Sequence, residues 1–439
     1  MVAPSRTYVG FGFGAIQAGL FLYEAHRSAA FGRLVVAEVM PEVVRAVREA
    51  GGRYTVNIAH ADRVEQATVG PVEMADPATE ADRARLVAAV AEAAEIGTAV
   101  PGVGYYCGAG PASICAILAA GLRRKAAQGG PRAVIYAAEN HNHAAEILEA
   151  AVMGEIPAGE RDAVRGRVRF LNTVVGKMSG VVADPDAIRD GHMATMTPAA
   201  PRAFLVEAFN RILISQIRFD DAPGEPPFQR GIRAFEEKPN LLPFEEAKLY
   251  GHNATHALAA YLGYMLAVRT IAELPLLPGV MAFLRAAFIQ ESGAALVKKH
   301  AGLDPLFTPD GYAAYADDLL ARMVNPHLLD TVERVGRDPA RKLAWDDRLI
   351  GTVRVALAMG VRPERYAFGA AAALAFMADS QAPPDAESLP SLLTRLWAEA
   401  EVTQHERDAV IAQIVTATHR LAGWAAADYP HLERFWAAR

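Results

Sequence analysis

A glycine-rich turn near the amino terminus constrains the fold of this chain more than any other feature. Residues 8–11 form a short apolar strand, Gly12-Phe13-Gly14 follows at once, and the apolar stretch 15–26 leads to a second strand at residues 34–39. Glycine lets the backbone approach a pyrophosphate, and the amino end of the following helix favours negative charge. The order strand, turn, helix and strand therefore predicts a dinucleotide-binding unit.

The fingerprint of this turn is incomplete, because Gln17 stands where a third glycine is usual. The second strand ends at Ala37-Glu38. A carboxylate there accepts hydrogen bonds from ribose hydroxyls and repels a phosphate, which favours NAD over NADP. The alternative is that the glycines only form a tight turn and that Glu38 caps a helix. The combined order favours a cofactor role, for which the candidates are Gly12, Phe13, Gly14, Ala15, Ile16 and Glu38.

The rest of the amino-terminal half alternates between helix-like and strand-like segments. Residues 81–95 have apolar side chains at helical spacing, and residues 97–103 have the character of a strand end and loop. Residues 111–125 resume a helix, and residues 133–138 form a buried strand. This alternation predicts an α/β fold with a Rossmann-like, mostly parallel sheet that is covered by helices.

The composition changes between residues 220 and 243, where five prolines stand in a charged context that suits an interdomain connection. Beyond it Ala and Leu predominate, and four segments have helix length: 244–268, 278–300, 309–323 and 366–377. We therefore predict a NAD-binding Rossmann-type domain at residues 1–240 and a mainly α-helical substrate and catalytic domain at residues 241–439.

The composition also argues against several classes of protein. A formal net charge of -6 without a basic block argues against a nucleic-acid partner. The uncharged stretch 96–122 is interrupted by six glycines and two prolines, which argues against a membrane span. No secretory pattern opens the chain, and two cysteines are too few for a disulfide framework or a thiolate zinc site. We expect a cytoplasmic protein without a membrane partner.

The segment from Lys248 to His256 carries side chains that suit alcohol chemistry. On an α-helix at about 100° per residue, Lys248, His256 and Asn253 lie at about 0°, 80° and 140°, so all three can face one cleft. Partial burial disfavours the ammonium form of a lysine, which suits a general base, and an amide can donate a hydrogen bond to a developing alkoxide. Asn253 replaces the glutamate of an H-E-x-x-H site between His252 and His256, so no metal is expected.

The spacing of Lys248, Asn253 and His256 resembles that of the polyol-specific long-chain dehydrogenases, the mannitol dehydrogenase family. Similar family stretches occur at residues 291–299, at residues 325–343 and at Asp347-Arg348-Leu-Ile. The resemblance runs from the amino-terminal glycines to the carboxyl-terminal helices, and it is to the branch that acts on mannitol 1-phosphate.

The resemblance implies a metal-independent oxidation of a secondary alcohol, in which hydride passes to NAD while Lys248 takes the hydroxyl proton. It implies a polyol or polyol phosphate as substrate, and a ketose as product. Asn140 and Asn253 would stabilise charge on the reacting oxygen, and His256 would position the substrate. The resemblance also assigns to the cofactor site Thr98, Ala99 and Val100, together with Gly12, Gly14 and Glu38.

One departure from the family pattern concerns the substrate pocket. The chain has Val174-Val175-Gly176-Lys177 where members commonly have Val-Val-Asp-Arg, so a carboxylate is absent. Two alternatives therefore stay open. One is a dehydrogenase for a non-polyol hydroxy acid, and the other is a dinucleotide-binding sensor or regulatory protein of the same fold.

A group of basic residues in the carboxyl-terminal half suits a substrate phosphate, because guanidinium groups donate paired hydrogen bonds to such oxygens. The alternative is an ordinary solvated helix face. The substrate-binding candidates are Arg334, Arg337, Arg341 and Lys342.

Overall fold

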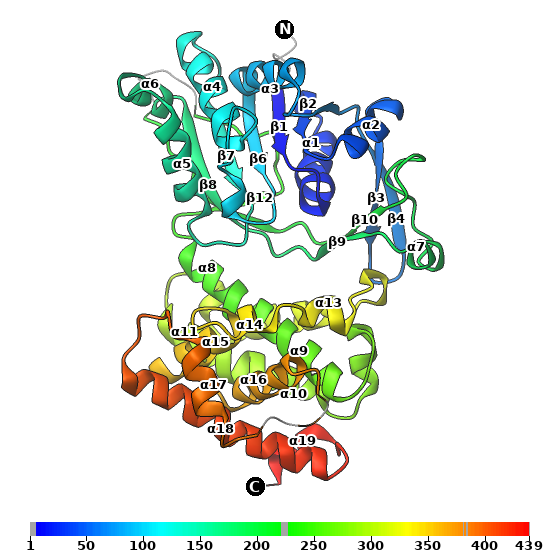
Figure 1. Ribbon diagram of the computed structural model, residues 1–439, viewed down its shortest axis with the longest axis vertical. Helices are drawn as coiled ribbons and strands as arrows, with labels where there is room; N and C mark the ends of the chain where they lie inside the picture. The colour runs from blue at the N-terminus through cyan, green and yellow to red at the C-terminus, as the bar shows by residue number, and fades with distance from the viewer. Residues whose placement is uncertain (1–5, 221–226, 381, 383–384, 439) are drawn as a thin grey trace. The chain divides into compact units, whose positions relative to one another are not determined.

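The computed structural model describes residues 6–220, 227–380, 382 and 385–438 of the chain. The chain divides between Leu242 and Pro243 into two compact units. In Figure 1 the first unit runs from blue to green and the second from green to red.

The first unit is built on an eight-stranded sheet with the order β12-β11-β8-β7-β6-β1-β2-β5. β11 (Ile212–Ser215) is antiparallel to β8, and β12 (Phe235–Lys238) is parallel to β11. The mostly parallel, Rossmann-like sheet predicted from the sequence is confirmed. The mutually parallel strands are β1 (Arg6–Phe11), β2 (Phe31–Ala37), β5 (Glu73–Ala75), β6 (Ala93–Thr98), β7 (Ala133–Ala137) and β8 (Val168–Val174).

β1 lies where the strand order reverses, with β2 on one side and β6 on the other. In open parallel sheets, ligands bind beyond the carboxyl ends of the strands at such a reversal. Alternate side chains of a strand face opposite sides of the sheet. Tyr8 accordingly belongs to one hydrophobic core, whereas Val9 and Phe11 belong to another. The central strand is thus buried on both faces.

Helices supply the other half of each core (Figure 1). The core around Tyr8 includes residues of α2 (Pro41–Glu49) and of the π-helical segment η1 (Gln17–Leu22), which continues into α1 (Tyr23–Arg27). The core around Val9 includes residues of α3 (Glu80–Glu92), α4 (Ile114–Ala127), α5 (Ala144–Glu155) and α6 (Arg161–Arg165).

A second, four-stranded sheet in the first unit was not predicted from the sequence. Its order is β4 (Val64–Val69), β3 (Tyr54–Ala59), β10 (Ala203–Glu207) and β9 (Ser179–Val182). β3 and β10 come from segments far apart in the chain and pair in parallel. The sheet packs against η1, where a Cβ on Gly19 would lie 2.4 Å from Val206, so glycine permits the close approach.

Three sequence-predicted boundaries were wrong. The helix expected at residues 81–95 ends at Glu92, and β6 begins at Ala93. Glu95 is buried in that strand and accepts a hydrogen bond from the Tyr136 hydroxyl at 2.8 Å. The helix expected from residue 111 begins at Ile114, because the Ser113 hydroxyl caps it by accepting from the Ala116 N–H. The second strand ends at Ala37 rather than at residue 39.

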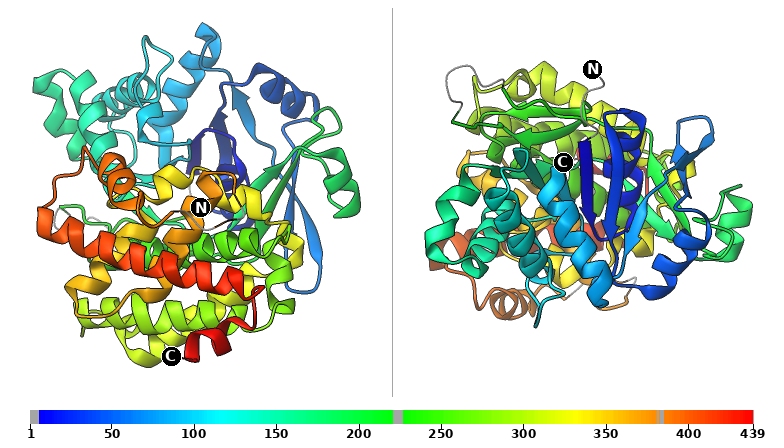
Figure 2. Two further views of the ribbon diagram at one scale, coloured as in Figure 1. Left: turned by 60° about the horizontal axis from the view of Figure 1, so that its bottom comes forward. Right: turned by 90° about the horizontal axis from the view of Figure 1, so that it is seen from above.

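The second unit is helical, as predicted (Figure 2). Its centre is α9 (Ala254–Met265) packed against α16 (Glu364–Met377), where a Cβ on Gly369 would stand 2.5 Å from Leu258. α18 (Gln404–Ala426), drawn in orange-red, covers α16. The remaining α-helices are α8 (Leu242–Glu246), α10 (Val280–Ala286), α11 (Ala294–Lys299), α12 (Pro309–Met323), α13 (Val332–Gly336), α14 (Pro339–Lys342), α15 (Arg348–Ala358), α17 (Leu389–Leu396) and α19 (Leu432–Ala437).

One continuous helix in the described part of the chain, Val280–Lys299, has the length and apolarity of a membrane span, with a mean hydropathy of 1.4. Its middle segment η6 (Ala287–Gly293) packs against α12 and α16, and it carries the buried Glu291. The Glu291 carboxylate accepts the N–H groups of Arg365 and Tyr366 at the start of α16. These contacts are those of a core helix.

Candidate active site

Gly12 forms a turn at the carboxyl ends of three strands. Its φ of +83° lies in the left-handed region, and a Cβ there would stand 2.7 Å from the carbonyl oxygen of Ala99. Its N–H donates to the carbonyl oxygen of Ala37 at 2.9 Å. Only glycine fits this link between β1, β2 and β6.

Gly14 stands in open space, since no heavy atom beyond its adjoining residues and its own helix backbone lies within 4 Å of the position that its Cβ would take. The helix that follows begins beside it, with the Ala18 N–H donating to the Gly14 carbonyl oxygen at 2.9 Å. An open backbone face at the amino end of a helix suits the approach of an anionic group such as a pyrophosphate.

The three apolar candidates of this turn have their side chains in the core. Phe13 packs edge-on against Tyr54 and Phe204, with ring centroids 4.9 and 5.3 Å away. Ala15 is buried in the same core, and Ile16 packs against it. These three residues therefore offer a ligand their backbone, not their side chains.

Glu38 follows β2 directly and is 7% exposed. One carboxylate oxygen accepts the Met40 N–H at 2.9 Å, but Met40 is itself the N-cap of α2 and no side chain caps this helix, so Glu38 is not the helix cap that the alternative interpretation expected. Its other oxygen has no hydrogen-bond donor among the described residues and stays available to a ligand hydroxyl. The role of Glu38 at the cofactor stays a prediction.

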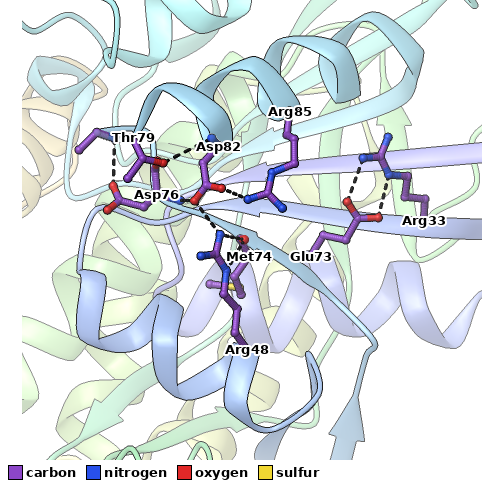
Figure 3. Close-up of polar contacts among 9 residues, drawn as sticks. Arg33, Arg48, Glu73, Met74, Asp76, Thr79, Asp82 and Arg85 are labelled. Atoms are coloured by element: carbon purple, nitrogen blue, oxygen red, sulfur yellow. Dashed lines mark hydrogen bonds and ion pairs between the residues drawn. The ribbon is translucent and has the colours of Figure 1, made fainter.

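The strand edge behind Glu38 is held by a buried carboxylate (Figure 3). Asp82 accepts from Arg48 Nη2 at 2.6 Å and from the Asp76 N–H at 2.8 Å, and it also pairs with Arg85. The Arg48 guanidinium donates to the Met74 carbonyl oxygen as well. This network joins α2, β5 and α3. It fixes the neighbouring carbonyl group of Ala75, which accepts the Glu38 N–H at 3.0 Å.

Glu139 organises the end of β6, and the sequence analysis did not select it. Its carboxylate accepts from the Thr98 hydroxyl at 2.9 Å, from the Val100 N–H at 3.0 Å, and from the Tyr106 hydroxyl. Ala99 is held from the other side, by a hydrogen bond to the Phe11 carbonyl oxygen at 3.0 Å. The predicted cofactor segment 98–100 is thus fixed by a buried acid that precedes the exposed Asn140.

In the second unit, Lys248 and Asn253 lie on the π-helical segment η4 (Ala247–Asn253), and His256 lies on α9. A π-helical turn holds more residues than an α-helical turn. The angles calculated from α-helical spacing are therefore wrong for this segment. π-Bulges are frequent at functional sites, which makes η4 a structural marker that the sequence pattern did not reveal.

Lys248 is half-buried, and its environment favours the neutral amine. Burial and the positive charge of Arg348 lower its pKa to about 8, against the opposing effect of Glu245. A lysine with this pKa is available as a base near neutral pH far more often than an exposed one. Asn253, at the end of η4, makes no side-chain capping bond to α9.

Two histidines follow Lys248 and are held neutral. Burial and the neighbouring His256 lower the pKa of His252 well below its usual value. Burial, Arg334 and Arg348 lower the pKa of His256 to about 3. His256 Nε2 lies 3.2 Å from Asp330 Oδ2, but Asp330 also pairs with Arg334, which compensates its charge. A neutral His256 can exchange hydrogen bonds with a substrate without adding charge.

Arg348 is the residue that the sequence analysis missed in this cluster. It is the first residue of α15 and pairs with the capping residue Asp347, with Nε 2.7 Å from Oδ1. Its charge influences the pKa values of Lys248, His252, His256 and Lys342. The available signal was its place in Asp347-Arg348-Leu-Ile, one of the stretches that carried the resemblance.

The four basic residues predicted to bind substrate differ in their burial and in their distance from His256. Lys342 is buried, and burial with Arg348 and Arg341 lowers its pKa to about 8. Its amine donates to the Arg337 carbonyl oxygen. Arg334 and Lys342 both act on the pKa of His256, so they lie near it; Arg334 is nevertheless exposed, as are Arg337 and Arg341. The helix face is thus partly solvated and partly turned toward the histidine.

Comparison with known proteins identifies both units. Residues 6–224 match the Mannitol dehydrogenase Rossmann domain, and residues 240–421 match the Mannitol dehydrogenase C-terminal domain. The chain belongs to the mannitol dehydrogenase family. The resemblance inferred from the sequence is therefore confirmed, and the protein is a dehydrogenase of this family with a dinucleotide-binding Rossmann domain.

Relatives in the mannitol dehydrogenase family include the mannitol-1-phosphate 5-dehydrogenase of Bacillus licheniformis. It is 32% identical over 363 residues, which cover 82% of this chain and 85% of the relative. The Pseudomonas fluorescens mannitol 2-dehydrogenase, solved with NAD and D-mannitol, has a TM-score of 0.70 at 17% identity and covers 100% of this chain and 96% of its own. A D-sorbitol dehydrogenase also has a TM-score of 0.70, at 15% identity, covering 94% of this chain and 95% of its own. These two structures share the fold.

Proposed function

We propose that this protein is a NAD-dependent dehydrogenase that interconverts a polyol phosphate, such as mannitol 1-phosphate, and the corresponding ketose phosphate in the cytoplasm. The observation that carries the proposal is the lowered pKa of Lys248 within a cationic cluster on η4, α14 and α15. The 32% identity to a mannitol-1-phosphate 5-dehydrogenase supports the same substrate class.

The residues of the first unit fit a dinucleotide. Gly14 offers an open backbone face at a helix amino end, where the pyrophosphate would lie. Glu38 keeps one carboxylate oxygen for a ribose hydroxyl and disfavours a phosphate there, which is the basis for proposing NAD over NADP. When bound, NAD supplies the acceptor for the hydride of the alcohol carbon.

Residues of the second unit would accept the proton of the substrate hydroxyl. Lys248, as the neutral amine, accepts the proton of the substrate hydroxyl as the hydride leaves the carbon. Asn253 donates an amide hydrogen bond to the oxygen on which negative charge grows, and Asn140 is assigned the same role by the family pattern. Neutral His256 orients a substrate hydroxyl. No step needs a metal.

The charge of the cluster favours an anionic substrate. Arg334, Lys342 and Arg348 lie near His256, where Arg334 pairs with Asp330 and Arg348 pairs with Asp347. Removing cations from water disfavours their charged forms, and a bound phosphate would offset that cost through charge-assisted hydrogen bonds.

A substrate panel tests the proposal directly. Purified protein is assayed for NAD reduction with mannitol 1-phosphate, free mannitol, other polyols and sugar acids, and NADP is tested as a control. We expect kcat/KM to be highest for the polyol phosphate with NAD. A preference for free polyols would refute the phosphate assignment while leaving the dehydrogenase chemistry in place.

The altered pocket segment supports a second candidate function. A Cβ on Gly176 would meet only Phe209, at 3.7 Å, so packing does not require glycine there. The missing carboxylate is therefore a chemical difference, which is compatible with a non-polyol hydroxy acid as substrate. Activity on sugar acids alone would support that dehydrogenase. NADH binding without turnover on any substrate would support a dinucleotide sensor.

A further inference from the structure

The two cysteines of the chain lie at either end of a glycine-containing loop beside the candidate cofactor segment. Cys107 is exposed, and Cys115, the second residue of α4, is buried. The residues between them include Gly108, Gly110 and Pro111. Such a loop can adjust its backbone more readily than a helix or strand can.

The backbone brings the two cysteines close together. The Cys115 N–H donates to the carbonyl oxygen of Tyr106 at 3.0 Å, and Tyr106 is bonded to Cys107. Standard bond lengths then limit the Cα separation of the cysteines to about 7 Å, against about 4.4–6.8 Å in disulfides. Cys107 also contributes to the raised pKa of the Cys115 thiol, as expected for two thiols that lie near each other.

The same loop is tied to the predicted cofactor segment. Tyr106, next to Cys107, donates its hydroxyl proton to the Glu139 carboxylate. The other oxygen of Glu139 holds the Val100 N–H at 3.0 Å, and the Thr98 hydroxyl bonds the oxygen that Tyr106 uses. A displacement at Cys107 is therefore transmitted by one residue to the group that fixes residues 98–100.

We propose that Cys107 and Cys115 form a reversible redox modification site, which a peroxide oxidises to an intramolecular disulfide, and that this disulfide weakens dinucleotide binding. A disulfide needs a sulfur–sulfur distance of about 2.05 Å, which is shorter than the contact distance of two thiols that are not bonded. Closing that gap moves Cys107 and pulls Tyr106 away from Glu139. The effect on the dinucleotide rests on the proposed function, whereas the disulfide itself does not.

The chemistry balances with the peroxide as the oxidant. The exposed Cys107 thiolate attacks one peroxide oxygen, which breaks the O–O bond, gives a sulfenic acid and releases water after protonation. Cys115 then loses its proton, and its sulfur attacks Cys107 Sγ and expels hydroxide, which leaves as a second water. Overall two thiols are oxidised and one peroxide is reduced to two waters. Burial and Cys107 raise the pKa of the Cys115 thiol, so the exposed Cys107 is the thiol that reacts with the peroxide first.

Intact-mass measurement tests the disulfide independently of activity. The full-length protein is treated with hydrogen peroxide under mild conditions, quenched by alkylation and analysed with peptide mapping. We expect the mass to fall by two hydrogen atoms, one peptide pair joined through Cys107 and Cys115, and full reversal by dithiothreitol. Oxygen adducts on Cys107 without a cross-link, or only intermolecular disulfides, would overturn the proposal.

The effect on the dinucleotide is tested with NADH binding by fluorescence and, where turnover exists, the KM for NAD. Oxidation should weaken binding by about fivefold or more, with reversal on reduction. The matched variants Cys107→Ser and Cys115→Ala should bind NADH like the reduced protein and lose this sensitivity to peroxide. A disulfide that leaves NADH binding unchanged would refute the switch. Absence of polyol turnover with intact NADH binding would refute the proposed function but not the redox site.

Discussion

In the first unit the candidate residues are held by backbone geometry, whereas in the second they depend on buried charge. Gly12 occupies a left-handed turn against Ala99, and Glu139 fixes residues 98–100 through two hydrogen bonds. Lys248 and His256 instead owe their protonation states to burial and to Arg348. The first arrangement suits binding of a ligand through backbone shape and hydrogen-bond donors. The second sets the pKa values of Lys248 and His256. Mutations should therefore separate binding from chemistry.

The largest expected effect is the loss of the base. Lys248→Ala should lower kcat by about 10²–10⁴-fold, the usual contribution of a general base, while NADH binding stays close to that of the wild type. Steady-state kinetics and NADH titration measure the two quantities. The matched control is Lys298→Ala, which removes an exposed lysine of the same unit and should leave kcat unchanged. Unaltered turnover in Lys248→Ala would reject the assigned base.

The next effect concerns the turn of the first unit. Gly12→Ala should lower the free energy of unfolding by about 1–3 kcal/mol, because a side chain strains the left-handed turn and meets the Ala99 carbonyl group. Gly14→Ala should keep normal stability but weaken NADH binding, because its Cβ enters the open backbone face. Chemical denaturation and NADH titration separate the two. Normal NADH affinity in Gly14→Ala would place the pyrophosphate elsewhere.

The charge coupling of the second unit predicts a pH dependence. Since Lys248 acts as the neutral amine, kcat/KM should rise with pH through about pH 8 and level off above it. Arg348→Gln removes a cation that disfavours the ammonium form of Lys248. The pH at which kcat/KM rises should therefore move to a higher value. If the pKa of Lys248 rises by one unit, kcat/KM at pH 7 falls about tenfold.

The control for this pH shift is Arg354→Gln. Arg354, on the same helix, pairs with Asp346 and Glu406 and does not contribute to the lowered pKa of Lys248. The rise of kcat/KM with pH in Arg354→Gln should coincide with that of the wild type. If Arg348→Gln changes the rate but kcat/KM still rises at the same pH, Arg348 does not lower the pKa of Lys248.

The smallest expected effect is a loss of stability on substitution of Asp82, in the hydrogen-bond network near Glu38. Asp82→Asn weakens the bonds that join α2, β5 and α3, and should cost about 1–2 kcal/mol of stability. Glu73→Gln, in the exposed pair with Arg33, should cost about 0–1 kcal/mol. Urea denaturation compares the two. Equal losses would mean that the buried carboxylate of Asp82 contributes no more than a surface pair.

The parts of the fold that follow from local pattern could be predicted. Buried apolar strands, the turn at Gly12 and the Ala- and Leu-rich second unit are periodic or compositional signals over short windows. The four-stranded sheet was missed because β3 and β10 pair across about 150 residues, and no local pattern encodes such a partner. Glu95 was taken for a helix residue because its burial depends on Tyr136 and Ile232.

The same limit applies to the candidate site. Sequence spacing selected Lys248, Asn253 and His256, but it assumed α-helical angles where the chain forms a π-helical segment. It selected Thr98 and Val100 without the carboxylate of Glu139 that holds them. A residue that acts through others far along the chain leaves no mark in a short motif.

The amino-acid sequence by itself determined the family, the parallel sheet followed by helices, and the residue types at the glycine turn and the lysine segment. The sheet and the helices depend on local periodicity, whereas the family followed from the resemblance of the motifs to those of known proteins. The tertiary structure alone decided which acids and bases are buried, that Arg348 lowers the pKa of Lys248, and that the backbone brings two cysteines near each other across a loop. Burial and charge act through space, so they exist only once distant segments have packed together.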